Sequence, residues 1–269
     1  MNGHFNIHWT ALLRIVGRGS DRGSFVRSLL LLLCLGSAFA WTASGKQPVA
    51  FITSGPGLNG APLRFEINQG QVESRYAFVA RGRECNVLIS PTDAVIALGP
   101  AARNPARFVH FHLEGANPLA IASGIQKLPG QANYYIGNDP AAWHAGIPLY
   151  PKVQVSQIYP GIDLVYYGDE SARLEYDFIL KPGARPDQIQ LRIDGVDGMK
   201  LNGAGDLVLE IGGEQIRQHA PVIYQWVNGV RTPVRGGYYL AGGSRIGFRV
   251  GDYDSRLGLV IDPTLSFST

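Results

Sequence analysis

The alternation of apolar and charged residues between positions 158 and 180 is the sequence feature that most constrains the fold. Residues 173–180 read R-L-E-Y-D-F-I-L, with an apolar side chain at every second position up to residue 178. This period of two is typical of a strand with one buried face. Residues 162–167 are apolar on both faces except at Asp163, which predicts a central strand covered on both sides. A polar turn at 168–171 joins the two runs, so the stretch predicts an antiparallel pair.

Short runs of the same kind recur along the rest of the chain. Turn signals separate them about every 8–12 residues, which is typical of β-sandwiches and barrels. No window shows a helical period, so we expect little helix. Strands are predicted at residues 63–67, 76–80, 86–90, 94–98, 108–113, 133–136, 153–156, 162–167, 173–180, 189–193, 207–211, 222–227, 230–234, 238–240, 245–250 and 259–265.

These strands predict an all-β fold, a many-stranded antiparallel β-sandwich. They outnumber the seven strands of a single immunoglobulin-type sandwich. Two packed β subdomains, divided near residues 148–152, are therefore an alternative to one sandwich. The strongest local signal is Asn228-Gly229, because both residues tolerate the positive φ that a two-residue type I′ hairpin requires.

An export signal is predicted at residues 1–40. The apolar run 29–35 follows Arg27 and leads into Ala38-Phe39-Ala40, a small-x-small cleavage pattern. A run of about 12 apolar residues suits a signal peptide and falls short of the ~20 that span a bilayer. We expect cleavage after Ala40, a linker at 41–57, a β-rich domain at 58–269, and a secreted or cell-envelope location. An uncleaved membrane anchor is the alternative.

Charge and cysteine content narrow the function classes. Residues 1–40 carry four arginines and one aspartate, so the remainder has 20 basic and 20 acidic residues. A neutral chain lacks the electrostatic footprint of a nucleic-acid binder. After cleavage at Ala40, Cys85 is the one cysteine left, so no internal disulfide is expected and Cys85 is interpreted as a buried small hydrophobe.

Several segments resemble the N-terminal domain of SBBP-repeat proteins, which are exported bacterial proteins. In these proteins a β-rich domain of unknown function precedes predicted β-propeller repeats. The resemblance implies no reaction, cofactor or catalytic residue. It covers residues 58–269 and rests on L-R-F-E-I-N-Q-G-Q (63–71), N-Y-Y-I-G-N-D-P-A-A-W (133–143), Y-P-G-I-D-L-V-Y-Y-G (159–168), L-E-Y-D-F (174–178), G-D-L-V-L (205–209), P-V-I-Y-Q (221–225) and L-V-I-D-P-T-L-S-F-S-T (259–269).

The chain departs from that pattern in two places. It stops at Thr269, about where the first repeat would begin, which indicates either a truncated reading frame or a free-standing copy of the domain. Residues 108–113 read F-V-H-F-H-L, where relatives more often carry arginines or other polar residues at the alternating positions.

Those histidines form a candidate metal site. His110 and His112 stand two apart in a predicted strand, and Glu114 is next on the same face. Two imidazoles and a carboxylate are zinc ligands. The structural interpretation, which we favour, places residues 109, 111 and 113 in the core and the histidines in solvent, with no metal or other cofactor.

Asp163, Glu175 and Asp177 form a candidate catalytic cluster on the central strand pair. Two carboxyl groups flanking a sugar bond are the machinery of glycoside hydrolysis. In the structural interpretation, Glu175 and Asp177 face solvent or pair with Arg173 or Arg192. Asp163 then binds a backbone group in a turn.

Asn138, Asp139 and Trp143 form a candidate binding surface. Asn138-Asp139-Pro140 is typical of a turn or the start of a short helix, with Asp139 as the cap. The neighbouring Trp143, Tyr134 and Tyr135 offer faces on which a sugar ring stacks, unless they are buried.

The common nucleophile, nucleotide and metalloprotease motifs are absent from the sequence. We therefore expect a non-catalytic, exported β-rich module for cell-surface or extracellular binding or assembly, with a cell-surface glycan or a protein as partner. The alternative is a carbohydrate-active hydrolase that uses the carboxylates of the central strand pair.

Overall fold

The computed structural model describes residues 63–82, 85–98, 107–169 and 173–268. Contacts divide the chain into two units, Met1–Lys46 and Gln47–Thr269, and every described residue belongs to the second. The predicted signal peptide (1–40) and linker (41–57) lie outside the described residues. Within those residues no helix is long and apolar enough to cross a membrane.

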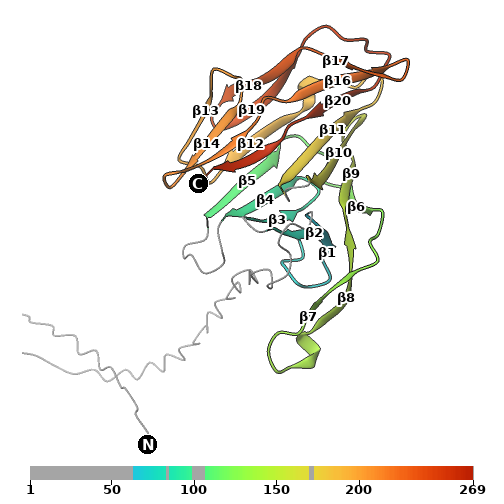
Figure 1. The fold of residues 1–269 in the computed structure, drawn as a ribbon, viewed down its shortest axis with the longest axis vertical. Helices are drawn as coiled ribbons and strands as arrows, with labels where there is room; N and C mark the ends of the chain where they lie inside the picture. Colours follow the sequence, from blue (N-terminus) through green and yellow to red (C-terminus); the bar gives the residue numbers. More distant parts are fainter. Residues whose placement is uncertain (1–62, 83–84, 99–106, 170–172, 269) are drawn as a thin grey trace, which may run out of the picture. The chain divides into compact units, whose positions relative to one another are not determined.

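The described residues form three antiparallel sheets (Figure 1). The largest is ten-stranded, with the spatial order β18 (Gly236–Gly242), β19 (Arg245–Val250), β12 (Gln190–Asp194), β5 (Arg107–Leu113), β4 (Asp93–Leu98), β3 (Cys85–Ile89), β2 (Phe78–Arg81), β1 (Phe65–Ile67), β8 (His144–Tyr150) and β7 (Gln131–Tyr134). The order is mostly that of a meander, because strands that follow one another in the chain pair as hairpins.

The second sheet contains the central strand pair predicted from the sequence. In the described part of the chain it has seven strands, in the order β17 (Val230–Pro233), β16 (Val222–Val227), β20 (Leu259–Asp262), β11 (Leu174–Leu180), β10 (Ile162–Gly168), β9 (Lys152–Tyr159) and β6 (Ile121–Ile125). β10 pairs with β11 on one side and β9 on the other, so it is central, as predicted.

The smallest sheet has four strands among the described residues, in the order β13 (Gly198–Leu201), β14 (Leu207–Ile211), β15 (Glu214–Gln218) and β21 (Leu265–Ser268). Two short 3₁₀ helices, η1 (Pro140–Ala142) and η2 (Pro186–Gln188), complete the regular structure. The prediction of an all-β sandwich with little helix is confirmed.

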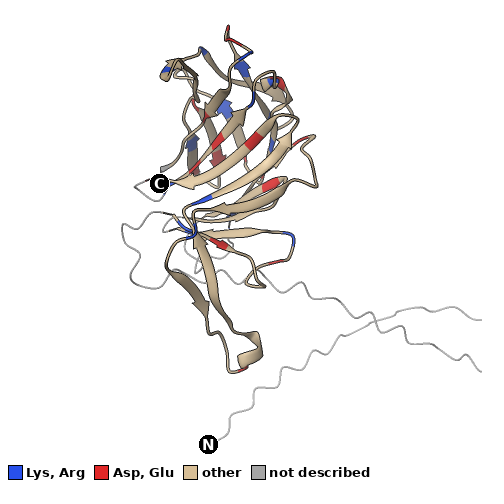
Figure 2. Ribbon diagram, turned by 90° about the vertical axis from the view of Figure 1, so that its right-hand side faces the viewer, with Lys and Arg blue, Asp and Glu red and all other residues tan. Residues whose placement is uncertain are grey.

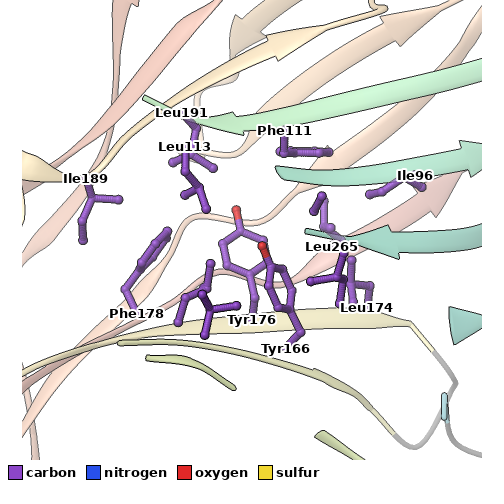
Figure 3. Packing of buried hydrophobic residues seen from close by; sticks show 14 of the residues in the cluster. Ile96, Phe111, Leu113, Tyr166, Leu174, Tyr176, Phe178, Ile189, Leu191 and Leu265 are labelled. Atoms are coloured by element: carbon purple, nitrogen blue, oxygen red, sulfur yellow. The ribbon is translucent and has the colours of Figure 1, made fainter. Parts of the chain in front are cut away.

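One hydrophobic core joins the inner faces of the three sheets. The rings of Tyr166 and Tyr176 lie side by side and point from the seven-stranded sheet toward Phe111 and Leu113 of the ten-stranded sheet (Figure 3). The predicted division near residues 148–152 falls where the chain passes from β8 to β9. Buried residues from both sides of it, among them Phe111 before and Val153 after, belong to this same cluster.

Local turn chemistry explains several connections. Asn228 and Gly229 have φ values of 51° and 79° and join β16 to β17 with Val227 opposite Val230, which confirms the predicted type I′ hairpin. Cys85 is buried, as expected.

Some predicted strand limits were wrong. β7 ends at Tyr134 rather than continuing to residue 136, and residues 259–265 form parts of two strands, β20 and β21. The sequence pattern missed β6, β8, β13 and β15. These strands contain glycine, proline or several polar residues, and pairing with a neighbour holds them extended without an alternating pattern.

Candidate functional site

The hairpin of β7 and β8, with the loop 135–143 between them, forms an arm that extends away from the other strands (Figure 1). Every residue of that loop is exposed. Among residues 131–150, Asp139 is the one Asp, Glu, Lys or Arg. The arm accordingly shows almost no blue or red in Figure 2. The arm therefore presents an exposed surface with a single charged side chain, Asp139.

The tip of the arm carries two aromatic rings and an aliphatic side chain. Tyr135, Ile136 and Trp143 are 62%, 52% and 40% exposed. The rings of Tyr135 and Trp143 meet edge to face, with centroids 5.3 Å apart and planes at 79°, a favourable aromatic arrangement. This pairing keeps both rings together in water.

Hydrogen bonds set the backbone of the tip. Asp139 caps η1 by accepting a bond from the Ala141 N–H at 3.0 Å, which confirms the predicted cap. The indole N–H of Trp143 donates to the Gly137 carbonyl at 3.2 Å. Asn138, Asp139 and Trp143, which the sequence placed in one candidate surface, thus belong to one short loop.

The root of the arm is held by a buried polar trio. The Tyr134 hydroxyl donates to Glu66 and accepts a bond from Arg81 Nε at 2.7 Å. The side chains of Arg81 and Glu66 are only 8% and 9% exposed. Burial, with the bond to Glu66, raises the pKa of Tyr134 to about 12. The hydroxyl therefore stays protonated and bridges the two charged groups.

A glycine also shapes the root. Gly70 has a φ of +113°, and a Cβ there would lie 2.7 Å from the His144 ring. The first turn after β1 therefore packs closely against the start of β8. Sequence reasoning missed this trio and contact, because the residues come from separate strands and no motif links them.

The candidate carboxylates lie on the outer face of the seven-stranded sheet. Glu175 and Asp177 alternate with buried residues of β11, as predicted. The register that pairs Phe178 with Ile261 sets Asp177 beside Asp262 of β20, a neighbour that the sequence did not reveal. The arginines that the sequence suggested as partners lie elsewhere among the described residues: Arg173 contacts Asp169, and Arg192 contacts Glu114 and Asp194.

Burial and mutual repulsion perturb these carboxyl groups. Burial first, and then the charge of Asp262, raises the pKa of Asp177 to about 6. Burial also raises the pKa values of Asp262 and Glu175. The Tyr167 hydroxyl donates to Asp177 Oδ1 at 3.0 Å. Asp177 therefore ionises at a higher pH than an ordinary aspartate.

Asp163 has a structural position. Its Oδ1 accepts the backbone N–H of Gln157 at 2.7 Å, and its Oδ2 accepts a bond from the Gln154 amide at 3.1 Å. Gln157 has a positive φ of 53°, and the register of β9 and β10 shifts nearby. Asp163 therefore holds a bulge.

His110 and His112 lie on the outer face of β5, and Glu114 follows its last residue. The side chains of Val109, Phe111 and Leu113 are buried. His112 contacts Asp93. Glu114 contacts Arg245 at 2.7 Å, and burial together with the Arg75 cation lowers the pKa of His110. In the described ranges no group of three His, Cys, Asp or Glu side chains is arranged to hold a metal ion.

An apolar cavity lies in the core between the sheets. Its volume is about 10 Å³, and its walls include Phe111, Tyr166, Tyr176 and Leu265. That volume suffices for about one water molecule. The arm tip, which lies on the surface, is therefore the better candidate for binding a larger ligand.

Comparison with known proteins supplies a family and no activity. No curated protein and no solved structure matches the chain. The family described as a domain of unknown function, DUF7948, matches residues 65–264. The match begins at β1 and ends beyond β20, so it includes the arm and the carboxylate face. The chain therefore belongs to the DUF7948 family.

Proposed function

We propose that this protein is an exported, non-catalytic binding module that engages a cell-surface or extracellular glycan through the tip of its arm. The observation that carries the proposal is the exposed pair of rings, Tyr135 and Trp143, on an arm stiffened at its root. Exposed aromatic side chains that stay in water at a fixed site are a mark of binding surfaces.

The polar groups at the tip favour a glycan over a bilayer or a second apolar surface. Asn138 and Asp139 are exposed beside the rings. Asp139 uses one oxygen for the cap, leaving the other to accept bonds from sugar hydroxyls. Moving a charged carboxylate at the tip into a membrane would cost free energy. Rings and hydrogen-bonding groups together suit a neutral sugar.

The export part of the proposal is supported by the apolar run 29–35 and the small-x-small pattern that ends at Ala40. The resemblance to SBBP-repeat proteins supports a role in which the domain precedes and presents propeller repeats. In both settings the arm would act outside the cytoplasm, where cell-surface polysaccharides are accessible.

Binding to a panel of insoluble and soluble polysaccharides, including peptidoglycan, tests the proposal. We expect Trp143→Ala to weaken binding at least about tenfold, as expected for an aromatic anchor, without lowering the melting temperature. Trp226→Ala is the matched control, because Trp226 is 57% exposed in another hairpin. No binding by the wild-type chain, or equal losses in both variants, would refute the proposal.

The carboxylate face supports a second candidate, a carbohydrate-active hydrolase. The raised pKa of Asp177, about 6, suits a proton donor near neutral pH. Asp177→Asn should then abolish polysaccharide hydrolysis, while Asp163→Asn should act through stability because Asp163 holds the bulge. Unchanged product formation by Asp177→Asn would eliminate this candidate.

A further inference from the structure

β6 is the outermost strand of the seven-stranded sheet. It pairs with β9 along one side, from Ile121 opposite Ser156 to Ile125 opposite Lys152, and in the described part of the chain no strand pairs with its other side. Leu119 and Ile121 are 84% and 70% exposed, the highest values among the large hydrophobic residues described. An edge of this kind is a template for another strand.

Edge strands are commonly protected by charge, proline or an irregularity, and most other edges here have such protection. The edge strand β21 has no such protection, but its Leu265 side chain is buried. β6 has no charge, no proline and no register shift. The protected edges are β17 with Arg231 and Pro233, β13 with Lys200, β18 with a register shift after Leu240, and β7 with one after Ala132.

The sequence of β6 is nearly the same when read in either direction. It is I-A-S-G-I, so antiparallel pairing of two copies about Ser123 sets isoleucine opposite isoleucine and serine opposite serine. Alanine and glycine then oppose each other. Small residues are needed on that face, because a Cβ at Gly124 would lie 2.3 Å from the Tyr150 ring. The strand is therefore complementary to itself.

We propose that two copies of this chain pair through β6 about a two-fold axis, which joins their seven-stranded sheets into one continuous sheet. An isologous contact requires a self-complementary patch, and strand addition supplies backbone hydrogen bonds along the whole edge. The pairing also covers Ile121 and Leu119, the most exposed apolar side chains described. The partner that fits this edge is a second copy of the chain.

Sedimentation velocity of the exported chain over a concentration series tests the pairing. We expect a wild-type dimer. The double variant Ile121→Lys and Ser123→Lys should weaken it at least about tenfold, because like charges would face each other across the pair. Both side chains are exposed, so circular dichroism should not change. Val230→Lys is the matched control, since Val230 is 65% exposed on the edge strand β17.

Disulfide trapping tests the register. Ser123→Cys should form an intermolecular disulfide under mild oxidation, because residues directly opposite in a sheet have Cα atoms within disulfide range. Val230→Cys should not. A monomeric wild-type protein at all concentrations, a dimer insensitive to the two lysines, or equal trapping of both cysteine variants would overturn the proposal. Each of these results leaves the glycan proposal for the arm untouched.

Discussion

Tyr176 and Asp177 are neighbours in the chain and occupy opposite faces of the same sheet. The Tyr176 ring lies in the core, where it contacts the rings of Tyr166 and Phe178, and its hydroxyl accepts a bond from Gln218. Asp177 lies outside, against Asp262. The free energy of unfolding should therefore respond to these two side chains in opposite ways.

Tyr176→Ala should lower the free energy of unfolding by about 3–5 kcal/mol, because it removes a large buried ring and leaves a cavity. Urea denaturation measures this change. Tyr176→Phe keeps the ring and should cost only about 1 kcal/mol for the hydrogen bond. A loss below about 1 kcal/mol for the alanine variant would show that the ring is not buried.

Asp177→Asn should stabilise the protein at neutral pH. The folded pKa of about 6 lies above the ordinary value of 3.8, so the unfolded chain ionises first and stability falls as pH rises from about 4 to 6. Asparagine removes this penalty, roughly 1–2 kcal/mol after allowance for solvent screening. Melting temperatures at pH 4 and pH 7.5 should agree with the wild type at the lower pH and exceed it at the higher.

Asp254→Asn serves as a control, because its effect on stability at neutral pH should have the opposite sign. Hydrogen bonds from Arg256 lower the pKa of Asp254 to about 2, so its contribution is present at neutral pH and is lost as the pH falls through the folded pKa. This variant should therefore melt lower than the wild type at pH 7.5. A stabilising Asp254→Asn would contradict the electrostatic reasoning for both residues.

The arm is attached to the rest of the fold at its root, where β8 pairs with β1. Tyr134 connects it to Glu66 and Arg81, and most side chains beyond Tyr134 on the arm are exposed until Ile147. Removal of one hydroxyl should therefore loosen the arm without unfolding the sheets.

Tyr134→Phe should accelerate amide hydrogen exchange in residues 131–147 at least about tenfold, because it removes both hydrogen bonds of the hydroxyl and one such bond accounts for about that factor. Exchange in β10 and β11 should stay unchanged. Tyr135→Phe is the matched control, because that ring is exposed at the tip. Equal exchange in the two variants would mean that the trio does not hold the arm.

Several strands could not be predicted because their pattern is weak. β8 contains Gly146 and Pro148, residues that discourage a strand assignment, and β15 has a single aliphatic residue, Ile216. Both are extended because neighbouring strands bind them on each side. The sequence therefore did not predict the arm as an element, although it correctly grouped the residues of the tip in one loop.

At the scale of the whole molecule, export from the cytoplasm is a proposal that depends on the sequence of residues 1–40. The intact mass of the protein recovered from outside the cytoplasm tests it. A mass that matches residues 41–269 would support cleavage after Ala40 and a free-standing domain. A larger mass would indicate propeller repeats in the natural protein, and an uncleaved N-terminus would contradict cleavage at Ala40.

The sequence by itself determined the all-β class, the two faces of β11, the type I′ turn at Asn228-Gly229 and the cap at Asp139. Each of these depends on side-chain alternation or backbone preference within a few residues. The tertiary structure alone decided that Asp262 lies beside Asp177, that Glu66 and Arg81 hold Tyr134, and that β6 is an edge. These features arise from pairing between distant strands, which packing of the whole core selects and no local pattern encodes.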